Sequence, residues 1–351
     1  MQLFNVGLCA FGMSGRVFHA PFLKQHPGFH IAGIVERSKN DSRELYPEAT
    51  IYRSIEELLE VDYIDIVVIN TPIQTHFDYC KKAIQAGKHV IIEKPFTIDT
   101  QEAEELCKLA DEKGVFLSVF QNRRFDRDFL QVEKVLQQKI LGEIKEVEIR
   151  FDRYRTTPGT KIHKENPDLK GSGAWHDLGS HLVDQAMVLF GKPESLFADI
   201  FSMKGKDTAN DYFEILMFYP NKMRLRLKSS VFTKEDHFAY KIHGNYGSFL
   251  QERSDRQEDE LVGGKNPIFN ENWVENMMES DGILHYIDNE NNSVREELWS
   301  APSSYMHYFQ EIYEHLVFDD ELPSPGKEIV LNMQIIDAAL ESSRTDTKIY
   351  L

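Results

Sequence analysis

Apolar residues in the first 120 positions form short continuous runs rather than alternating with polar ones. The runs cover Leu3–Phe11, Phe29–Val35, Asp65–Asn70, His89–Ile92 and Val115–Phe120. Helix signals lie between them: Ser54 and Glu57 form a capping box, and Asp99 can cap a helix that ends at Gly114. Strands that are apolar on both faces are typical of a parallel sheet covered by helices. The pattern predicts a doubly wound α/β domain over residues 1–122.

From residue 123 onward the pattern changes to alternation of apolar and polar residues. A helix over about Asp126–Leu141 is followed by an alternating stretch at 143–155. Further strand-like stretches are Ser195–Ser202, Asp211–Tyr219, Met223–Val231 and His237–His243. Residues 251–292 have weak periodicity and predict loops and short elements, and a last helix is expected at about Glu328–Ser342. Because alternation means one buried and one exposed face, residues 123–351 are predicted to form an α+β domain with a large, mostly antiparallel open sheet.

Composition narrows the class of protein without naming it. The chain has 351 residues, with 40 Lys and Arg against 57 Asp and Glu, and hence a net charge of −17. An acidic surface argues against nucleic acid or an anionic membrane as partner. There is no apolar run long enough for a membrane span and no basic region at the N-terminus, and three scattered cysteines suggest neither disulfides nor a metal site. These features favour a cytoplasmic protein.

Glycines follow the first predicted strand at the position of a phosphate-binding turn. The stretch Ala10-Phe11-Gly12-Met13-Ser14-Gly15 fits the G-x-G-x-x-G pattern with Ala10 in the first glycine place. Gly12 would let the backbone approach a pyrophosphate, and Gly15 would let the helix pack closely on the strand. A plain tight turn would use glycine in the same way. The position between the first strand and the first helix favours dinucleotide binding.

The end of the second strand bears on the choice of cofactor. Glu36 could accept hydrogen bonds from a ribose 2′-hydroxyl and would repel a 2′-phosphate, which favours NAD. Arg37 and Lys39 could instead pair with that phosphate and favour NADP. We expect NAD or NADP, with a preference for NAD.

Three further segments carry candidate chemistry. Asn70-Thr71-Pro72, with His76, follows the central strand Asp65–Asn70, and Glu93-Lys94-Pro95 follows the next strand, at the edge where doubly wound sheets bind ligands. A cis peptide bond before Pro95 is one hypothesis for how Lys94 is directed. In a helix-like run, Asp177, His181 and Asp184 would share one face. A carboxylate beside an imidazole suits proton transfer.

These segments together resemble the Gfo/Idh/MocA oxidoreductase family over nearly the whole chain. The shared features are the N-terminal glycine turn, Glu93-Lys94-Pro95 and Asp177-x-x-x-His181. The stretches Phe18–Phe22, Gln121–Asp126, Asp152–Arg155 and Asp177–Gln185 are similar to the branch that contains NADP-dependent scyllo-inositol dehydrogenase. The chain departs from that branch at Glu36-Arg37-Ser38, where the branch has a Thr-Ser-Arg stretch.

The resemblance implies an N-terminal Rossmann domain, an α+β substrate-binding domain and a site with three kinds of residue. It implies hydride transfer between a nicotinamide and a hydroxyl or ketone carbon of a sugar, polyol or inositol, with catalytic Lys94, Asp177 and His181. The expected cofactor-binding residues are Ala10, Phe11, Gly12, Ser14, Gly15, Glu36, Arg37, Asn70, Thr71, Pro72, His76, Glu93 and Lys94. The substrate candidates are Asn122, Arg123, Tyr154, Trp175 and Asp184, each of which could instead be structural.

Two other interpretations remain open at this point. The same fold could serve as a cofactor-binding sensor without turnover, although intact Lys94, Asp177 and His181 argue against it. The enzyme could also reduce a non-sugar carbonyl or an imine. Because an exposed sheet face is suited to self-association, we expect a homodimer or homotetramer.

Overall fold

The computed structural model describes residues 2–157, 159, 162–205, 207–235, 237–273 and 279–351. Its contacts divide the chain into two compact units. The first unit takes the chain up to Asn122, with the later segments Arg256–Trp273 and Ser304–Val330, and the second unit takes the rest. The division therefore differs from a single boundary after residue 122, because two later segments return to the first unit. Each unit is described separately.

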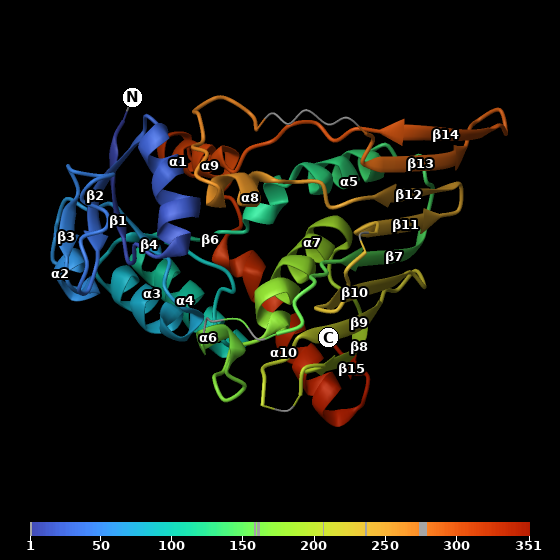
Figure 1. Ribbon diagram of the computed structural model, residues 1–351, viewed down its shortest axis with the longest axis horizontal. Coiled ribbons are helices and arrows are strands. Elements are labelled where there is room, and N and C mark those ends of the chain that lie inside the picture. The colour runs from blue at the N-terminus through green and yellow to red at the C-terminus, as the bar shows by residue number, and fades with distance from the viewer. Residues whose placement is uncertain (1, 158, 160–161, 206, 236, 274–278) are drawn as a thin grey trace. The chain divides into compact units, whose positions relative to one another are not determined.

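The first unit is built on a six-stranded parallel sheet (Figure 1). In spatial order its strands are β3 (Thr50–Tyr52), β2 (Phe29–Val35), β1 (Phe4–Leu8), β4 (Ile66–Ile69), β5 (His89–Ile92) and β6 (Leu117–Val119). All the neighbouring strands pair in parallel. The order 3-2-1-4-5-6 is that of a doubly wound sheet, and it confirms the predicted fold class for this half.

Helices cover both faces of this sheet, which explains its continuous apolar strands. A π-helical turn η1 (Gly15–His19) runs into α1 (Ala20–Gln25), which contacts α9 (Met306–Phe318). The other helices are η2 (Ile73–Thr75), α2 (Ile55–Leu59), α3 (His76–Gln85), α4 (Thr100–Lys113) and α8 (Gln257–Val262). Contacts link α2 to α3 and α3 to α4, on the face away from α1 and α9 (Figure 1). The side chains of β4 are accordingly all buried.

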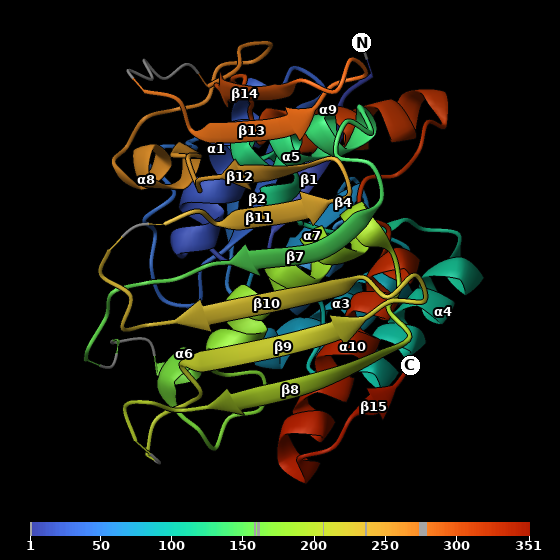
Figure 2. The ribbon, with the colours of Figure 1, turned by 90° about the vertical axis from the view of Figure 1, so that its right-hand side faces the viewer.

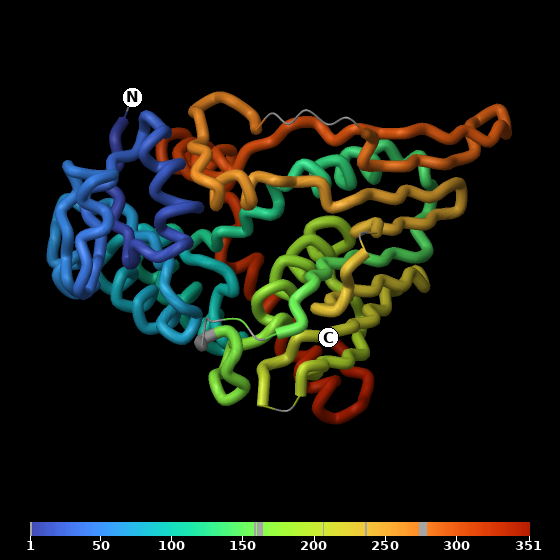
Figure 3. Tube along the Cα trace, viewed as in Figure 1, coloured from blue at the N-terminus to red at the C-terminus, as the bar shows by residue number. Residues whose placement is uncertain are grey.

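Aromatic packing explains why the segment 304–330 belongs to the first unit. The ring of Phe309 stacks on Phe22 of α1 at 5.5 Å, and Tyr308 meets Phe120 edge-on at 4.9 Å. Tyr308 also shares a hydrogen bond of 2.7 Å with the hydroxyl of Ser118. Figure 3 follows this orange-to-red segment back to the blue N-terminal part of the chain.

The second unit contains a nine-stranded sheet, which Figure 2 shows face-on. In spatial order the strands are β14 (Ser293–Leu298), β13 (Gly282–Ile287), β12 (Gly247–Gln251), β11 (Tyr240–Gly244), β7 (Ile144–Arg150), β10 (Arg224–Ser230), β9 (Tyr212–Phe218), β8 (Ser195–Phe201) and β15 (Ile349–Tyr350). Only the β7–β10 pair is parallel among the paired strands of the described residues. Buried and half-buried residues alternate along β9, so the predicted mostly antiparallel sheet is confirmed.

Helices pack on one face of this second sheet. They are η3 (Asn122–Phe125), α5 (Arg127–Gln137), α6 (Ile162–Glu165), the π-helical turn η4 (Trp175–Gly179), α7 (Ser180–Phe190) and α10 (Gly326–Thr345), which belongs to this unit from Leu331 on. Near the end of α10, the hydroxyls of Ser342 and Ser343 accept hydrogen bonds from the backbone amides of Ala198 and Ile200. These bonds attach the helix to β8. Within the described ranges, no helix is both long and apolar enough to span a bilayer.

The edge strand β14 was not predicted from the sequence. Residues 251–292 were expected to form loops and short elements, and their described part includes the six-residue elements α8 and β13, while residues 274–278 lie outside the described part of the chain. β14 follows directly. The side chains of β14 are almost all exposed, so this edge strand has no apolar face to reveal it in the sequence.

Candidate functional site

The turn after β1 closes on itself at Gly15. A Cβ atom at Gly15 would lie 2.4 Å from the carbonyl oxygen of Ala10, so only glycine fits there. A Cβ atom at Gly12 would meet no atom within 4 Å, so protein packing does not require glycine at that position. Bare backbone beside open space at the start of a helix is what a pyrophosphate needs. The turn therefore fits a dinucleotide cofactor.

The larger side chains of this turn are used inside the protein. The ring of Phe11 packs edge-on against Tyr46 at 5.7 Å. The hydroxyl of Ser14 donates a hydrogen bond to Glu93. Phe11 and Ser14 can therefore meet a cofactor mainly through their backbone.

Asn70, at the end of β4, clamps the glycine turn. Its Oδ1 accepts the amide of Ala10 at 2.9 Å, and its Nδ2 donates to the Ala10 carbonyl at 2.8 Å. The next residues, Thr71 and Pro72, also have partners within their own loop: the hydroxyl of Thr75 lies 2.7 Å from Thr71 Oγ1 and 2.8 Å from the carbonyl oxygen of Pro72. The exits of β1 and β4 are thus held together by one amide side chain.

Glu93, at the end of β5, ties the same edge to the first helix. Its Oε1 accepts from Ser14 and lies 2.9 Å from His19 Nε2, and its Oε2 accepts the amide of Lys94 at 3.1 Å. Burial acts to raise the pKa of this carboxyl. The hydrogen bonds and charge of its partners outweigh burial and bring the pKa to about 2, against an ordinary 4.5. Glu93 is therefore a buried carboxylate that holds three partners.

Lys94 is two residues beyond the end of β5 and is half-buried. The peptide bond between Lys94 and Pro95 is cis, which confirms that part of the sequence hypothesis. Parallel strands place their carboxyl ends at one edge, so Lys94 lies at the same edge of the sheet as the glycine turn.

His76 begins α3 and is almost fully buried. Its Nδ1 lies 2.9 Å from the carbonyl oxygen of Pro95, and its Nε2 lies 2.9 Å from that of Thr71. Burial lowers the pKa of the imidazole below its usual value, while the carbonyl contacts work in the opposite direction. The ring bridges the loops that follow β4 and β5.

Glu36 and Arg37, after β2, are placed very differently. The Glu36 carboxylate is buried and accepts the amide of Asp41 at 2.8 Å, the amide of Ser42 at 3.0 Å and the hydroxyl of Ser42 at 2.5 Å. Arg53 braces the same loop by donating to the carbonyls of Glu36 and Lys39. Arg37 is exposed. The carboxylate faces its own loop, and the guanidinium stands at the surface.

In the second unit, Asp177 and His181 lie across a change of helix type. Asp177 is in the π-helical turn η4, and His181, which is buried, is in the first turn of α7. Asp177 Oδ1 accepts from Lys164 Nζ at 2.7 Å, and both of these side chains are partly exposed. Single π-helical turns inside helices occur frequently at functional sites, and η1 in the first unit is a second example.

Two of the substrate candidates serve the interior of the second unit. Trp175 is fully buried, meets Phe213 edge-on at 5.0 Å and donates its indole N–H to the Ile336 carbonyl at 3.2 Å. Asp184 accepts two bonds from Arg124, at 2.8 and 2.6 Å, and one from Asn332 at 2.9 Å. Both side chains are thus used inside the second unit, and their contact with a substrate stays a prediction.

The remaining substrate candidates are spread over different surroundings. Arg123 is buried, pairs with Asp126 at 3.1 Å and lies over the ring of Phe151. Asn122 is also buried, at the end of the first unit's N-terminal segment. Tyr154 is more than half exposed, so its side chain is open to a ligand at the surface.

The structure also shows polar residues that sequence reasoning missed. Lys164 binds Asp177, and His19 binds Glu93. Burial raises the pKa of Asp126 to about 8, although Arg123 lowers it. Nothing in the spacing of these residues signals their partners, which are 13 or more positions away for Lys164 and His19. In the part of the chain that the structure describes, no cluster of His, Cys, Asp or Glu is arranged for a metal ion, and Cys9, Cys80 and Cys107 are buried free thiols.

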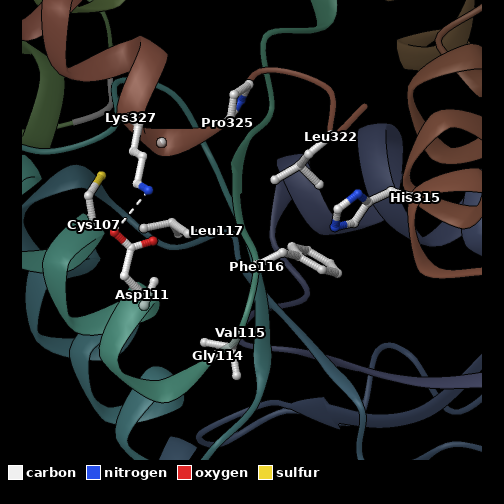
Figure 4. A pocket seen from close by; sticks show the side chains of 12 residues that line it. Cys107, Asp111, Gly114, Val115, Phe116, Leu117, His315, Leu322, Pro325 and Lys327 are labelled. Atoms are coloured by element: carbon white, nitrogen blue, oxygen red, sulfur yellow. Dashed lines mark ion pairs between the residues drawn. The ribbon is translucent and has the colours of Figure 1, made fainter. Parts of the chain in front are cut away.

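A cavity of about 320 Å³ in the first unit contains none of the predicted site residues (Figure 4). It lies where α4 ends and β6 begins, at the opposite end of the sheet from Lys94. Its lining includes Cys107, Phe116 and His315, and the Asp111–Lys327 ion pair of 2.9 Å lies beside it.

The strand order and the glycine turn identify the first unit as a dinucleotide-binding Rossmann domain. Family comparison agrees: residues 4–121 match the model "Oxidoreductase family, NAD-binding Rossmann fold", and residues 133–351 match "Oxidoreductase family, C-terminal alpha/beta domain". The chain belongs to the Gfo/Idh/MocA oxidoreductase family, as its sequence resemblance implied.

Relatives cover almost the whole chain. The scyllo-inositol 2-dehydrogenase (NADP(+)) IolW of Bacillus subtilis is 33% identical over 347 residues, 99% of this chain and 96% of that protein. The uncharacterized oxidoreductase YdgJ of Escherichia coli is 35% identical over 340 residues, 97% of this chain and 96% of its own. A crystal structure from Bacteroides fragilis is 40% identical, with a TM-score of 0.89 and full coverage of both chains.

Proposed function

We propose that this protein transfers a hydride between a nicotinamide cofactor and a hydroxyl or ketone carbon of a sugar, polyol or inositol. The supporting observation is full-length similarity to a scyllo-inositol 2-dehydrogenase in a chain that has Lys94, Asp177 and His181. A sensor without turnover would have no chemical use for these three residues together. The family relationship supports an oxidoreductase, and the sugar or polyol substrate is our inference.

The proposed roles follow from the chemistry of alcohol oxidation. When bound, the nicotinamide ring accepts or returns the hydride. Lys94 would donate a hydrogen bond to the substrate oxygen and stabilise the negative charge that develops there. His181 would take the hydroxyl proton in oxidation and return it in reduction. Asp177 would orient the imidazole, and it pairs with Lys164 at 2.7 Å.

Turnover by substituted proteins tests these roles. The protein is assayed with a panel of inositols, polyols and sugars, and with both NAD+ and NADP+. Lys94→Ala and His181→Ala should each lower kcat by at least about 100-fold while leaving cofactor binding intact. His285→Ala, at an exposed histidine of β13, is the control and should keep full activity. Tight cofactor binding with no turnover on any member of the panel would instead support the sensor, and activity on imines or non-sugar carbonyls would change the substrate class.

We also propose that NADP(H) binds at least as tightly as NAD(H), in contrast to the preference drawn from the sequence. The Glu36 carboxylate already accepts three hydrogen bonds from Asp41 and Ser42, which use most of its acceptor capacity within its own loop. Arg37 is exposed beside it and can pair with a 2′-phosphate.

Parallel fluorescence titrations with NADH and NADPH measure this preference. Arg37→Ala should weaken NADPH binding by about 10-fold or more, since a hydrogen bond to a charged group contributes about 1.5–3 kcal/mol. The affinity for NADH should not change. Lys39→Ala is the control for general loss of positive charge, because Lys39 is exposed and already pairs with Asp41. Stronger binding of NADH by the wild type would restore the role first given to Glu36.

We propose further that the exposed face of the nine-stranded sheet joins two copies of the chain. Its charges are interlaced: Glu148 pairs with Lys241 at 3.0 Å, and Glu214 pairs with Arg226 at 2.9 Å and Lys228 at 3.2 Å. When positive and negative side chains alternate on one surface, a two-fold axis can place the positive side chains of one copy against the negative side chains of the other. Light scattering should give a dimer or tetramer, and Arg226→Glu should shift it toward monomer. Because the three cysteines are buried free thiols, we propose a cytoplasmic location.

A further inference from the structure

His76 makes contacts that its sequence position did not suggest. As the first residue of α3, after Asn70-Thr71-Pro72, it was expected to line the nicotinamide pocket. Its ring is instead 1% exposed and lies between two backbone carbonyl oxygens, those of Thr71 and Pro95, each 2.9 Å from a ring nitrogen. Both ring nitrogens therefore face carbonyl oxygens, and neither is directed at a cofactor. The neutral imidazole donates a hydrogen bond to one of these carbonyls and packs against the other, whereas the protonated ring donates to both.

The two carbonyls belong to loops at neighbouring strand exits. Thr71 is two residues beyond the end of β4, and Pro95 is three residues beyond the end of β5, which pairs with β4 in parallel. A ladder bond at the end of the two strands joins the amide of Glu93 to the carbonyl of Ile69 at 2.9 Å. Past that point the imidazole lies against one carbonyl of each loop, and it reaches the residue immediately after Lys94.

Lys94 is thereby held from both sides of its own backbone. On its N-terminal side, Glu93 Oε2 accepts the Lys94 amide at 3.1 Å. On its C-terminal side, His76 Nδ1 holds the carbonyl of Pro95 and lies 3.2 Å from that of Phe96. A side chain attached to a backbone fixed at both ends samples fewer positions, and accurate placement of a reacting group is a large part of catalysis.

We propose that His76 is a positioning residue for Lys94, which bridges the loops after β4 and β5 and does not contact the cofactor. The inference rests on the proposed function for the role of Lys94 as the group that meets the substrate oxygen. It also has a consequence that needs no turnover. If the ring fixes the backbone around Lys94, its removal changes the surroundings of the Lys94 ammonium whether or not a substrate is known.

Two substitutions separate the bridge from the bulk of the ring. His76→Phe keeps a planar ring of similar volume and removes both nitrogens, whereas His76→Gln keeps one amide that can donate to a carbonyl. His89→Phe is the matched control, because His89 lies at the other end of β5 and accepts the amide of Phe116 at 3.1 Å. It removes one half-buried histidine contact from the same strand but far from Lys94.

Three measurements are made on each variant: kcat with the best substrate of the panel, the Kd for NADPH by fluorescence, and the rate at which an amine-acetylating reagent modifies Lys94. The last is followed by peptide mass spectrometry, with the exposed Lys145 as internal reference. We expect His76→Phe to lower kcat by about 10- to 100-fold, His76→Gln to lower it less, and both to keep the Kd within about twofold. The Lys94 modification rate should change at least threefold in His76→Phe and stay constant in His89→Phe.

Different failures point to different errors. A tenfold weaker Kd for NADPH in His76→Phe at unchanged Lys94 reactivity would show that His76 contacts the cofactor, and would overturn the inference. Equal losses of kcat in His76→Phe and His89→Phe would reduce His76 to a general structural role. If the wild type turns over nothing, the proposed function fails, but the Lys94 modification rate still decides whether His76 positions that side chain.

Discussion

Removing the charge of Glu93 should destabilise the first unit in a pH-dependent way. In Glu93→Gln the side chain keeps its shape, but a neutral amide replaces a carboxylate that accepts from Ser14, His19 and Lys94. The amide nitrogen cannot accept a hydrogen bond, so at least one of these donors loses its partner. The variant therefore tests the charge and the acceptor set without leaving a cavity.

The magnitude follows from the pKa of the carboxyl, which is about 2 in the folded protein against 4.5 ordinarily. A difference of this size corresponds to about 3 kcal/mol of folding free energy, and the side chain is only 12% exposed. Because the folded-state pKa is the lower one, this stability is present above pH 4.5 and is lost as the pH falls toward 2. By pH 3.5 roughly 1.4 kcal/mol of it is gone.

Urea denaturation followed by circular dichroism measures the effect. The free energy of unfolding of Glu93→Gln should lie about 3 kcal/mol below the wild type at pH 7, and the gap should shrink to about 2 kcal/mol at pH 3.5. Glu260→Gln is the control: Glu260 pairs with Lys265 at 2.7 Å, but at an exposed position, where an ion pair contributes at most about 1 kcal/mol. A gap for Glu93→Gln that stays constant between the two pH values would refute the argument that charge stabilises this site.

Three further predictions separate packing from ligand contact. Gly15→Ala should destabilise the fold by about 1–3 kcal/mol in thermal unfolding, because its Cβ would overlap the carbonyl of Ala10, whereas Gly12→Ala should keep Tm and weaken NADPH binding about tenfold in titration. Trp175→Ala should lower the unfolding free energy by about 3–5 kcal/mol, and Trp175→Phe by less with KM unchanged. Asp184→Ala should cost about 3 kcal/mol by removing the carboxylate that accepts from Arg124, and a raised KM in a fully stable variant would contradict this.

The parallel sheet of the first unit could be predicted from the sequence because its strands are buried on both faces. The expected strand at His89–Ile92 coincides with β5, and the apolar run at 65–70 contains β4. The far edge of the second sheet could not be predicted in this way. Most side chains of β14 are exposed, and Arg295, Glu296 and Glu297 follow one another in it, so its pairing with β13 leaves no apolar period.

The candidate site shows a different limit of sequence reasoning. The sequence places Glu36, Asn70 and Glu93 at the strand exits, where a polar side chain could meet either a cofactor or a neighbouring loop. Choosing between these requires knowing which donors lie nearby. For Glu36 the donors are only five and six residues away, yet they depend on how the loop at 36–42 turns back. For Glu93 the partners are 74 and 79 residues away.

These distant partners explain why the edge of the sheet is suited to hold reacting groups. Asn70 joins the exit of β4 to that of β1, Glu93 joins the exit of β5 to the helix after β1, and His76 joins the exits of β4 and β5. Each loop is therefore linked to two others, and none can shift without breaking hydrogen bonds of buried groups, which are costly to leave unpaired. A loop that binds a cofactor is usually a mobile part of a protein. Here Asn70, Glu93 and His76 offset that tendency. The backbone beside Gly12 and the backbone around Lys94 are therefore held in a fixed relative position without a bound ligand.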